Sequence, residues 1–134
     1  RAGGPEILKE CAVIRQKRGG CLTGEAVITT AGRLPSKHVI HTVGPVWKGG
    51  NHAEPDLLAN CYRNSLLLAD EHKLGSVAFP NISTGVFGYP KDLAAKVAIE
   101  VVRKTAPALE HVKHISFLCF DQENHDIYQA ALAD

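Results

Sequence analysis

The sequence predicts an α/β domain of three layers, α/β/α, in which helices cover both faces of a central mixed sheet. Strand-like and helix-like segments alternate in the order α-β-β-α-β-α-β-α. The clearest helix, over residues 91–105, has apolar residues at helical spacing, with Lys96, Glu100 and Arg103 on the opposite face. The run 114–120 is almost continuously apolar, which predicts a strand buried on both faces.

Local signals predict the remaining elements. The expected ranges are 5–18 for a first helix, 26–29 and 39–43 for two strands, 56–73 for a second helix and 76–80 for a third strand. The strands are rich in β-branched residues, and residues 32–36 between the first two have turn chemistry. Gly19-Gly20 ends the first helix, and Asp121 can cap a last one.

Composition limits the classes of function. The chain has 134 residues and forms one domain, with 45% hydrophobic and 22% charged residues. A net charge of +1 disfavours nucleic acid as a partner, and no apolar run reaches membrane-spanning length. Three of the four cysteines lie in apolar segments, which indicates reduced thiols in a cytoplasmic protein. The histidines show no metal-ligand spacing, so no metal is expected.

The loop over residues 81–90 is the most informative segment. Its sequence, Asn-Ile-Ser-Thr-Gly-Val-Phe-Gly-Tyr-Pro, lies between a predicted strand and a predicted helix that Pro90 helps to open. Glycines allow backbone N–H groups to approach an anion, and a helix N-terminus adds a partial positive charge. The loop therefore suggests binding of a phosphate-bearing ligand without lysine or metal, although such a loop can also be a plain connection.

Other chemistry is less well supported. Ser83 follows a strand as a hydrolase nucleophile does, but that turn needs glycine two residues earlier, where Asn81 stands. There is no P-loop and no Rossmann fingerprint. Phe87 has little local core to join and can contact a ligand, and Phe120 can either stack on a base or pack in the core.

Taken together, these residues resemble the macrodomain family, and specifically its MacroD-type branch of ADP-ribosyl hydrolases and O-acetyl-ADP-ribose deacetylases. The matching blocks run in order along the chain: residues 1–6, 20–26, 41–47, 61–66 and 78–90. Five collinear blocks are far more specific than one loop.

The resemblance implies roles for individual residues. The loop would hold a diphosphate through its backbone N–H groups, Phe87 would pack beside the distal ribose, and Phe120 would stack on adenine beside Asp121. The implied ligand-binding residues are Ser83, Thr84, Gly85, Val86, Phe87, Gly88, Phe120 and Asp121. No metal or other cofactor is implied.

This sequence departs from the family pattern in two ways. Asn81 and Gly3 each stand where the family usually has alanine. The family's first strands, its Asn-Ala-Ala-Asn motif and its glycine-rich loop with the catalytic aspartate would fall upstream of Arg1. We therefore expect an N-terminally incomplete domain over residues 1–134 and assign no catalytic residue within it.

The function implied is binding of ADP-ribose, in a protein that hydrolyses O-acetyl-ADP-ribose or mono-ADP-ribosyl esters on proteins. The expected partners are ADP-ribose, O-acetyl-ADP-ribose or an ADP-ribosylated protein. A reader module that binds ADP-ribose without catalysis is the alternative. An RNA-binding macrodomain is a further alternative, which the net charge disfavours.

Overall fold

The structure is a computed structural model, and it describes residues 22–30, 38–84, 87–119 and 121–133. The helix expected over 5–18 and the turn expected over 32–36 lie outside the described residues. So do three of the expected ligand-binding residues, Gly85, Val86 and Phe120.

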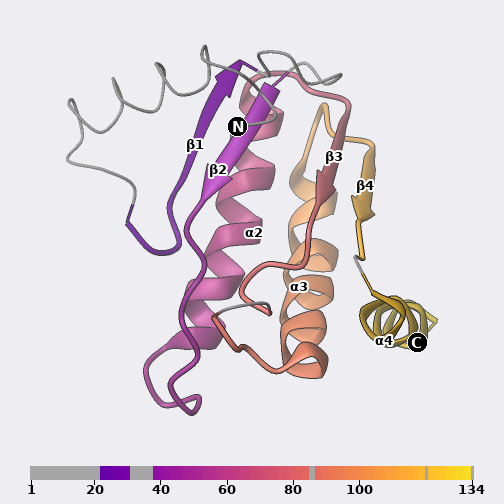
Figure 1. Cartoon of the computed structure of the whole chain (residues 1–134). Helices are drawn as coiled ribbons and strands as arrows, with labels where there is room; N and C mark the ends of the chain where they lie inside the picture. Colours follow the sequence, from indigo (N-terminus) through magenta and orange to yellow (C-terminus); the bar gives the residue numbers. More distant parts are fainter. Residues whose placement is uncertain (1–21, 31–37, 85–86, 120, 134) are drawn as a thin grey trace.

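The described elements follow the predicted order (Figure 1). They are β1 (Ala26–Thr30), β2 (His38–Thr42), α2 (Glu54–Glu71), β3 (Ser76–Phe79), α3 (Lys91–Thr105), a 3-10 turn (Ala106–Ala108), β4 (His114–Phe117) and α4 (Gln122–Leu132). The helix predicted over 91–105 has the bounds expected for it. The sequence suggested that Pro90 occupies the first helical position. In the structure Pro90 is the N-cap, one position earlier.

The strands form one antiparallel and one parallel pair, so both strand orientations of the predicted mixed sheet are present. β1 and β2 are antiparallel, with Ile28 opposite Ile40, whereas β3 and β4 are parallel, with Phe79 opposite Phe117. Among the described residues the two pairs are not joined to each other by hydrogen bonds. Figure 1 shows both pairs running along the α2–α3 layer.

β4 corrects one expectation. The apolar run 114–120 predicted burial on both faces, but His114 and Ser116 are exposed while Ile115 and Phe117 are half-buried. Leu118, just beyond the strand, is 58% exposed. The reason is that side chains alternate between the faces of a strand, and here the core covers only the face carrying Ile115 and Phe117.

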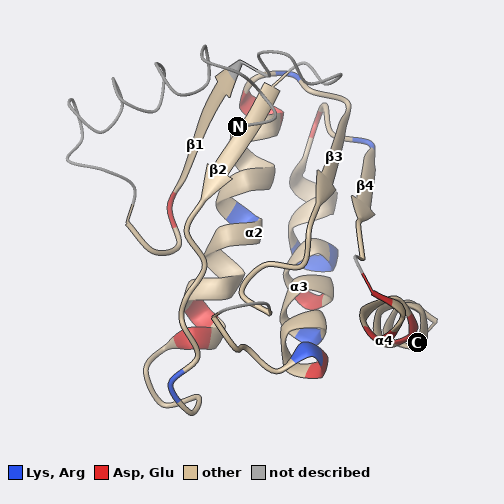
Figure 2. Cartoon of the chain, viewed as in Figure 1, with Lys and Arg blue, Asp and Glu red and all other residues tan. Residues whose placement is uncertain are grey.

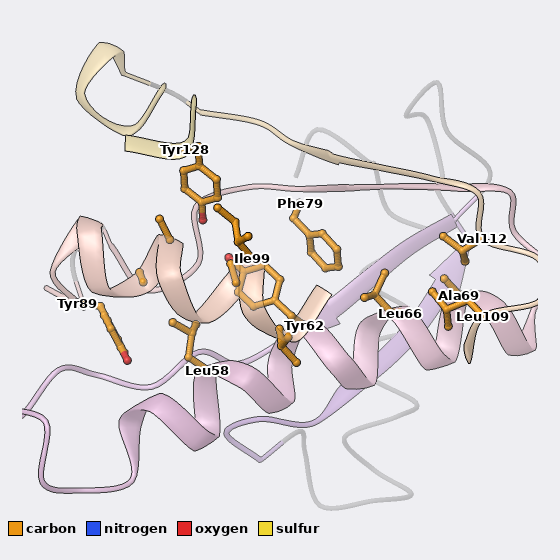
Figure 3. Close-up of a cluster of buried hydrophobic side chains, with 14 residues drawn as sticks. Leu58, Tyr62, Leu66, Ala69, Phe79, Tyr89, Ile99, Leu109, Val112 and Tyr128 are labelled. Carbon is orange, nitrogen blue, oxygen red and sulfur yellow. The ribbon is translucent and has the colours of Figure 1, made fainter. Parts of the chain in front are cut away.

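The core lies between α2, α3 and the strands (Figure 3). α2 contributes the face that the sequence predicted, with Leu58, Cys61, Tyr62, Ser65 and Ala69 all buried. Aromatic rings then connect the layers. Tyr62 of α2 meets Phe79 of β3 edge-on at 4.9 Å between ring centroids, and Phe117 of β4 lies 4.9 Å from Tyr128 of α4.

Among the cysteines, Cys119 is a free thiol and Cys61 is buried, while Cys11 and Cys21 lie outside the described residues. Within the described ranges no three His, Cys, Asp or Glu side chains are grouped so that they hold a metal ion. Within the same ranges, no helix has both the length and the apolar character needed to cross a membrane.

Candidate functional site

The β3–α3 loop, residues 80–90, brings together Ser83, Thr84, Phe87 and Gly88 from the predicted site. Its bend depends on left-handed backbone at two positions, Ser83 with φ 66° and Gly88 with φ 73°. The N–H of Tyr89 donates to the carbonyl of Ser83 at 2.9 Å and closes the loop on itself. Phe87 is 39% exposed, so its ring is presented to solvent rather than to the core.

The loop leads directly into the N-terminus of α3. Pro90 is the N-cap, and no side chain caps the free N–H groups of the first helical turn. Residues 81–90 contain no charged side chain, and Figure 2 shows this stretch of the ribbon without charge colours. Uncapped N–H groups and the helix dipole give the loop a positive potential without lysine or arginine. The arrangement suits a ligand with phosphate groups.

A second segment supports the loop from the side of β2. The N–H of Trp47 donates to the carbonyl of Phe87 at 2.9 Å. The Trp47 ring lies 4.7 Å from the ring of Tyr89, which is almost fully buried. Loop residues on both sides of Gly88 are therefore fixed against residues that follow β2.

Glu54 fixes the turn that carries Trp47. Its carboxylate is 1% exposed and accepts three backbone N–H bonds, from Lys48 at 2.7 Å, Gly50 at 3.0 Å and His52 at 2.6 Å. Burial raises the pKa of Glu54, but these three donors outweigh burial and lower the pKa to about 2. The charge belongs to the turn and is not available to a ligand.

Asn81 joins the ends of β3 and β4. Its side chain is 7% exposed, and its Nδ2 lies 3.9 Å from the sulfur of Cys119. Its Oδ1 is buried and has no hydrogen-bond partner among the described residues. The Asn81 amide is thus a buried group next to the loop, and within the described residues it leaves one polar atom unsatisfied.

Asp121 is a helix cap, as the sequence allowed. It accepts the backbone N–H of Asn124 at 2.8 Å, and its second oxygen lies 3.1 Å from the Lys91 ammonium. The Asn124 N–H first, and then Lys91, lower the pKa of Asp121. Lys91 also contacts Glu123. Because Lys91 is the first residue of α3, this contact brings Asp121 close to the end of the β3–α3 loop.

Sequence reasoning missed the supporting residues Trp47 and Glu54. Gly-Pro-Val-Trp directly after a strand was visible as a turn, and Trp47 is the only tryptophan of the chain. An apolar ring in a glycine-rich turn was a usable signal. The acceptor role of Glu54 was not visible, because it depends on how the turn folds back.

Comparison with known proteins gives one consistent answer. A family model described as Macro domain matches residues 1–98. The chain is 52% identical to a Macro domain-containing protein of Cupriavidus necator over 132 residues, which cover 98% of this chain and 76% of that protein. It is 50% identical to a Salmonella typhimurium protein named O-acetyl-ADP-ribose deacetylase over 132 residues, covering 98% and 74% of the two chains.

Solved structures agree. A variant macrodomain of Oceanobacillus iheyensis with ADPR superposes with a TM-score of 0.91 at 41% identity, covering 98% of this chain and 72% of that one. A Trypanosoma brucei macrodomain in complex with ADP-ribose gives a TM-score of 0.85 at 37% identity, covering 97% of this chain and 53% of that one.

Proposed function

This chain belongs to the macrodomain family, and on that premise we propose that it binds ADP-ribose with the diphosphate on the β3–α3 loop. The relative from Salmonella named a deacetylase and the two macrodomain structures with ADP-ribose support this assignment. The ligand-binding residues we propose are Ser83, Thr84, Gly85, Val86, Phe87, Gly88, Phe120 and Asp121.

One observation carries the proposal. The β3–α3 loop is free of charged residues, turns through left-handed backbone at Ser83 and Gly88, and runs into a helix whose first N–H groups have no side-chain cap. Two adjacent phosphates need several donors within a short distance, and backbone amides supply them without the mobility of lysine side chains. A dense anion therefore suits this loop better than an apolar or cationic ligand.

The remaining contacts extend the ligand in both directions from the diphosphate. Phe87, whose ring is exposed, would pack beside the distal ribose. Phe120 would stack on adenine, and Asp121 would lie next to it, held close to the loop by Lys91. A base stacked on an aromatic ring gains on the order of 1–3 kcal/mol.

We propose further that the protein hydrolyses an ester on the distal ribose. Water adds to the acyl carbon, the acyl–oxygen bond breaks, and acetate and ADP-ribose leave when the substrate is O-acetyl-ADP-ribose. Hydrolysis of a mono-ADP-ribosyl ester on a protein breaks the same acyl–oxygen bond, and it gives the free side-chain carboxylate and ADP-ribose. The alternative is a reader module that binds ADP-ribose and leaves esters intact. A cytoplasmic location is part of the proposal and is supported by the free thiol of Cys119.

Calorimetry with a ligand series tests the binding mode. ADP-ribose and ADP should bind, and adenosine, which lacks the diphosphate, should bind at least about tenfold more weakly, a difference of about 1.4 kcal/mol. Equal affinity for adenosine and ADP-ribose would exclude the loop as the diphosphate site. Acetate release from O-acetyl-ADP-ribose then separates a hydrolase from a reader.

A further inference from the structure

Gly44, two residues after β2, lies against the β3–α3 loop with no room for a side chain. A Cβ atom placed on Gly44 would be 2.2 Å from the Ser83 hydroxyl oxygen and 2.7 Å from the Cγ2 methyl of Ile82. The backbone of Gly44 is not among the positive-φ glycines. Space, and not backbone conformation, therefore requires glycine at this position.

Ser83 is the residue that fills the space. It has φ 66°, an unfavourable conformation for a residue with a side chain, so its surroundings must hold it there. Its hydroxyl oxygen is buried and has no hydrogen-bond partner among the described residues. Within the described part of the chain, the hydroxyl is thus held by packing against Gly44.

The same segment contacts the far end of the loop. Three residues after Gly44, the N–H of Trp47 donates to the Phe87 carbonyl, and the Trp47 ring packs on Tyr89. The Tyr89 N–H in turn donates to the Ser83 carbonyl. Residues 44–47 therefore touch the loop where it begins and where it ends, while the loop closes on itself between these points.

We propose that Gly44 is a positioning residue for the ligand, because the space that it leaves sets the place of Ser83 and hence the direction of the loop's amides. This inference rests on the proposed function, since it concerns the same diphosphate site. Hydrogen bonds weaken steeply when donors turn away from their acceptors, so a small shift of the loop affects several of them together.

Alanine at position 44 cannot be absorbed by the Ser83 side chain alone. The hydroxyl must retreat by about 1 Å to reach an ordinary contact of 3.4 Å. Rotation about χ1 moves the hydroxyl but leaves the Ile82 methyl at 2.7 Å, and a β-branched side chain has little freedom at χ1. The backbone at 82 and 83 must therefore move.

A double-mutant cycle in the full-length protein tests the inference. Gly44→Ala should weaken ADP-ribose binding by about tenfold, within the range of coupling between touching residues. In a Ser83→Gly background the hydroxyl is gone and left-handed backbone costs little, so the same change should cost clearly less, about threefold, because only the contact with the Ile82 methyl remains. The matched control is Gly75→Ala, since a Cβ there meets no atom within 4 Å, and its affinity should equal that of wild type.

The fluorescence of Trp47 gives a readout that needs no ligand. It is the only tryptophan, and it packs on Tyr89 at the end of the loop. Gly44→Ala should shift its emission in the free protein, and Ser83→Gly should restore it in part in the double variant. If wild type does not bind ADP-ribose, the proposed function fails, and the emission spectra still decide whether Gly44 positions the loop.

Two results would overturn the inference. One is a Gly44→Ala protein with wild-type affinity and emission. The other is an equal loss from Gly44→Ala with and without Ser83→Gly, which would show that the effect does not pass through Ser83. If Gly44→Ala fails to fold, recovery of folding and binding in the double variant supports the inference, and failure of both variants to fold overturns it.

Discussion

The carboxylate of Glu54, the first residue of α2, accepts the backbone N–H of His52 at 2.6 Å, two residues before it. The two other donors, the N–H groups of Lys48 and Gly50, come from the same turn that precedes the helix. A single buried carboxylate thus holds this turn through three backbone hydrogen bonds. Trp47 begins that turn, so Glu54 indirectly supports the β3–α3 loop.

This arrangement predicts a stability loss in acid. The pKa of Glu54 is about 2 in the fold and 4.5 in its ordinary state, so the unfolded chain takes up the proton at higher pH. The stabilisation is complete above pH 4.5 and is lost as the pH falls toward 2. Glu54→Gln should lower the melting temperature at pH 7, and its difference from wild type should shrink below pH 4.5. Asp56→Asn, an exposed change in the same helical turn, is the control.

Phe87 should matter for the ligand and little for the fold. Its ring is 39% exposed in the free protein, and contact with a ribose would bury this apolar surface. We expect Phe87→Ala to weaken ADP-ribose binding by about tenfold, or about 1.4 kcal/mol, with an almost unchanged melting temperature. Leu67→Ala removes an apolar side chain of similar exposure, 47%, from α2 and should change neither quantity. A large drop in melting temperature without loss of affinity would assign Phe87 to the core.

Asp121 has a structural role that must be separated from a ligand role. Asparagine caps helices as well as aspartate does, so Asp121→Asn should keep α4 and its melting temperature, whereas Asp121→Ala should lower it. If the carboxylate also contacts adenine, Asp121→Asn should weaken ADP-ribose binding while the fold is kept. Calorimetry together with thermal unfolding distinguishes the two roles. Unchanged affinity in Asp121→Asn would show that Asp121 only caps the helix and does not contact the ligand.

Those parts of the fold that depend on local chemistry were predictable. The spacing of Ala94, Ala98 and Val101 predicted α3 correctly. An apolar face opposite a solvated face is produced by the helical repeat and not by the alternation of a strand. Asp121 was recognisable as a cap because the capping bond spans only three residues. Both features need no information from the rest of the chain.

Features that depend on distant segments were not predictable. The exposure of His114 and Ser116 depends on which face of β4 the core covers, and an apolar run does not encode that. The requirement for glycine at position 44 arises from a hydroxyl almost forty residues later. The residue types at 81–90 suggested phosphate binding. The segment that supports this loop, however, follows β2, and its contact with the loop could not be predicted.

The groove between β2 and β3 leads to the last prediction. It has a volume of about 640 Å³ and is lined by β2, by β3, and by Ser65, Leu74 and Ile82. Within the described residues each of these strands is paired along one edge only, β2 with β1 and β3 with β4. Open strand edges beside an apolar groove favour pairing with another chain.

We expect an extended strand to fill this groove, because it would satisfy both open edges and cover the apolar lining at once. The polypeptide 1–134 alone should then self-associate in sedimentation velocity. The probe is a polypeptide with those residues of the Oceanobacillus iheyensis macrodomain that lie outside its match to this chain. Its addition should yield a discrete complex and slow amide exchange in β2 and β3, and a polypeptide of scrambled sequence should not. A monomeric 1–134 polypeptide, with no change in amide exchange on addition of the segment, would show that the groove needs no strand.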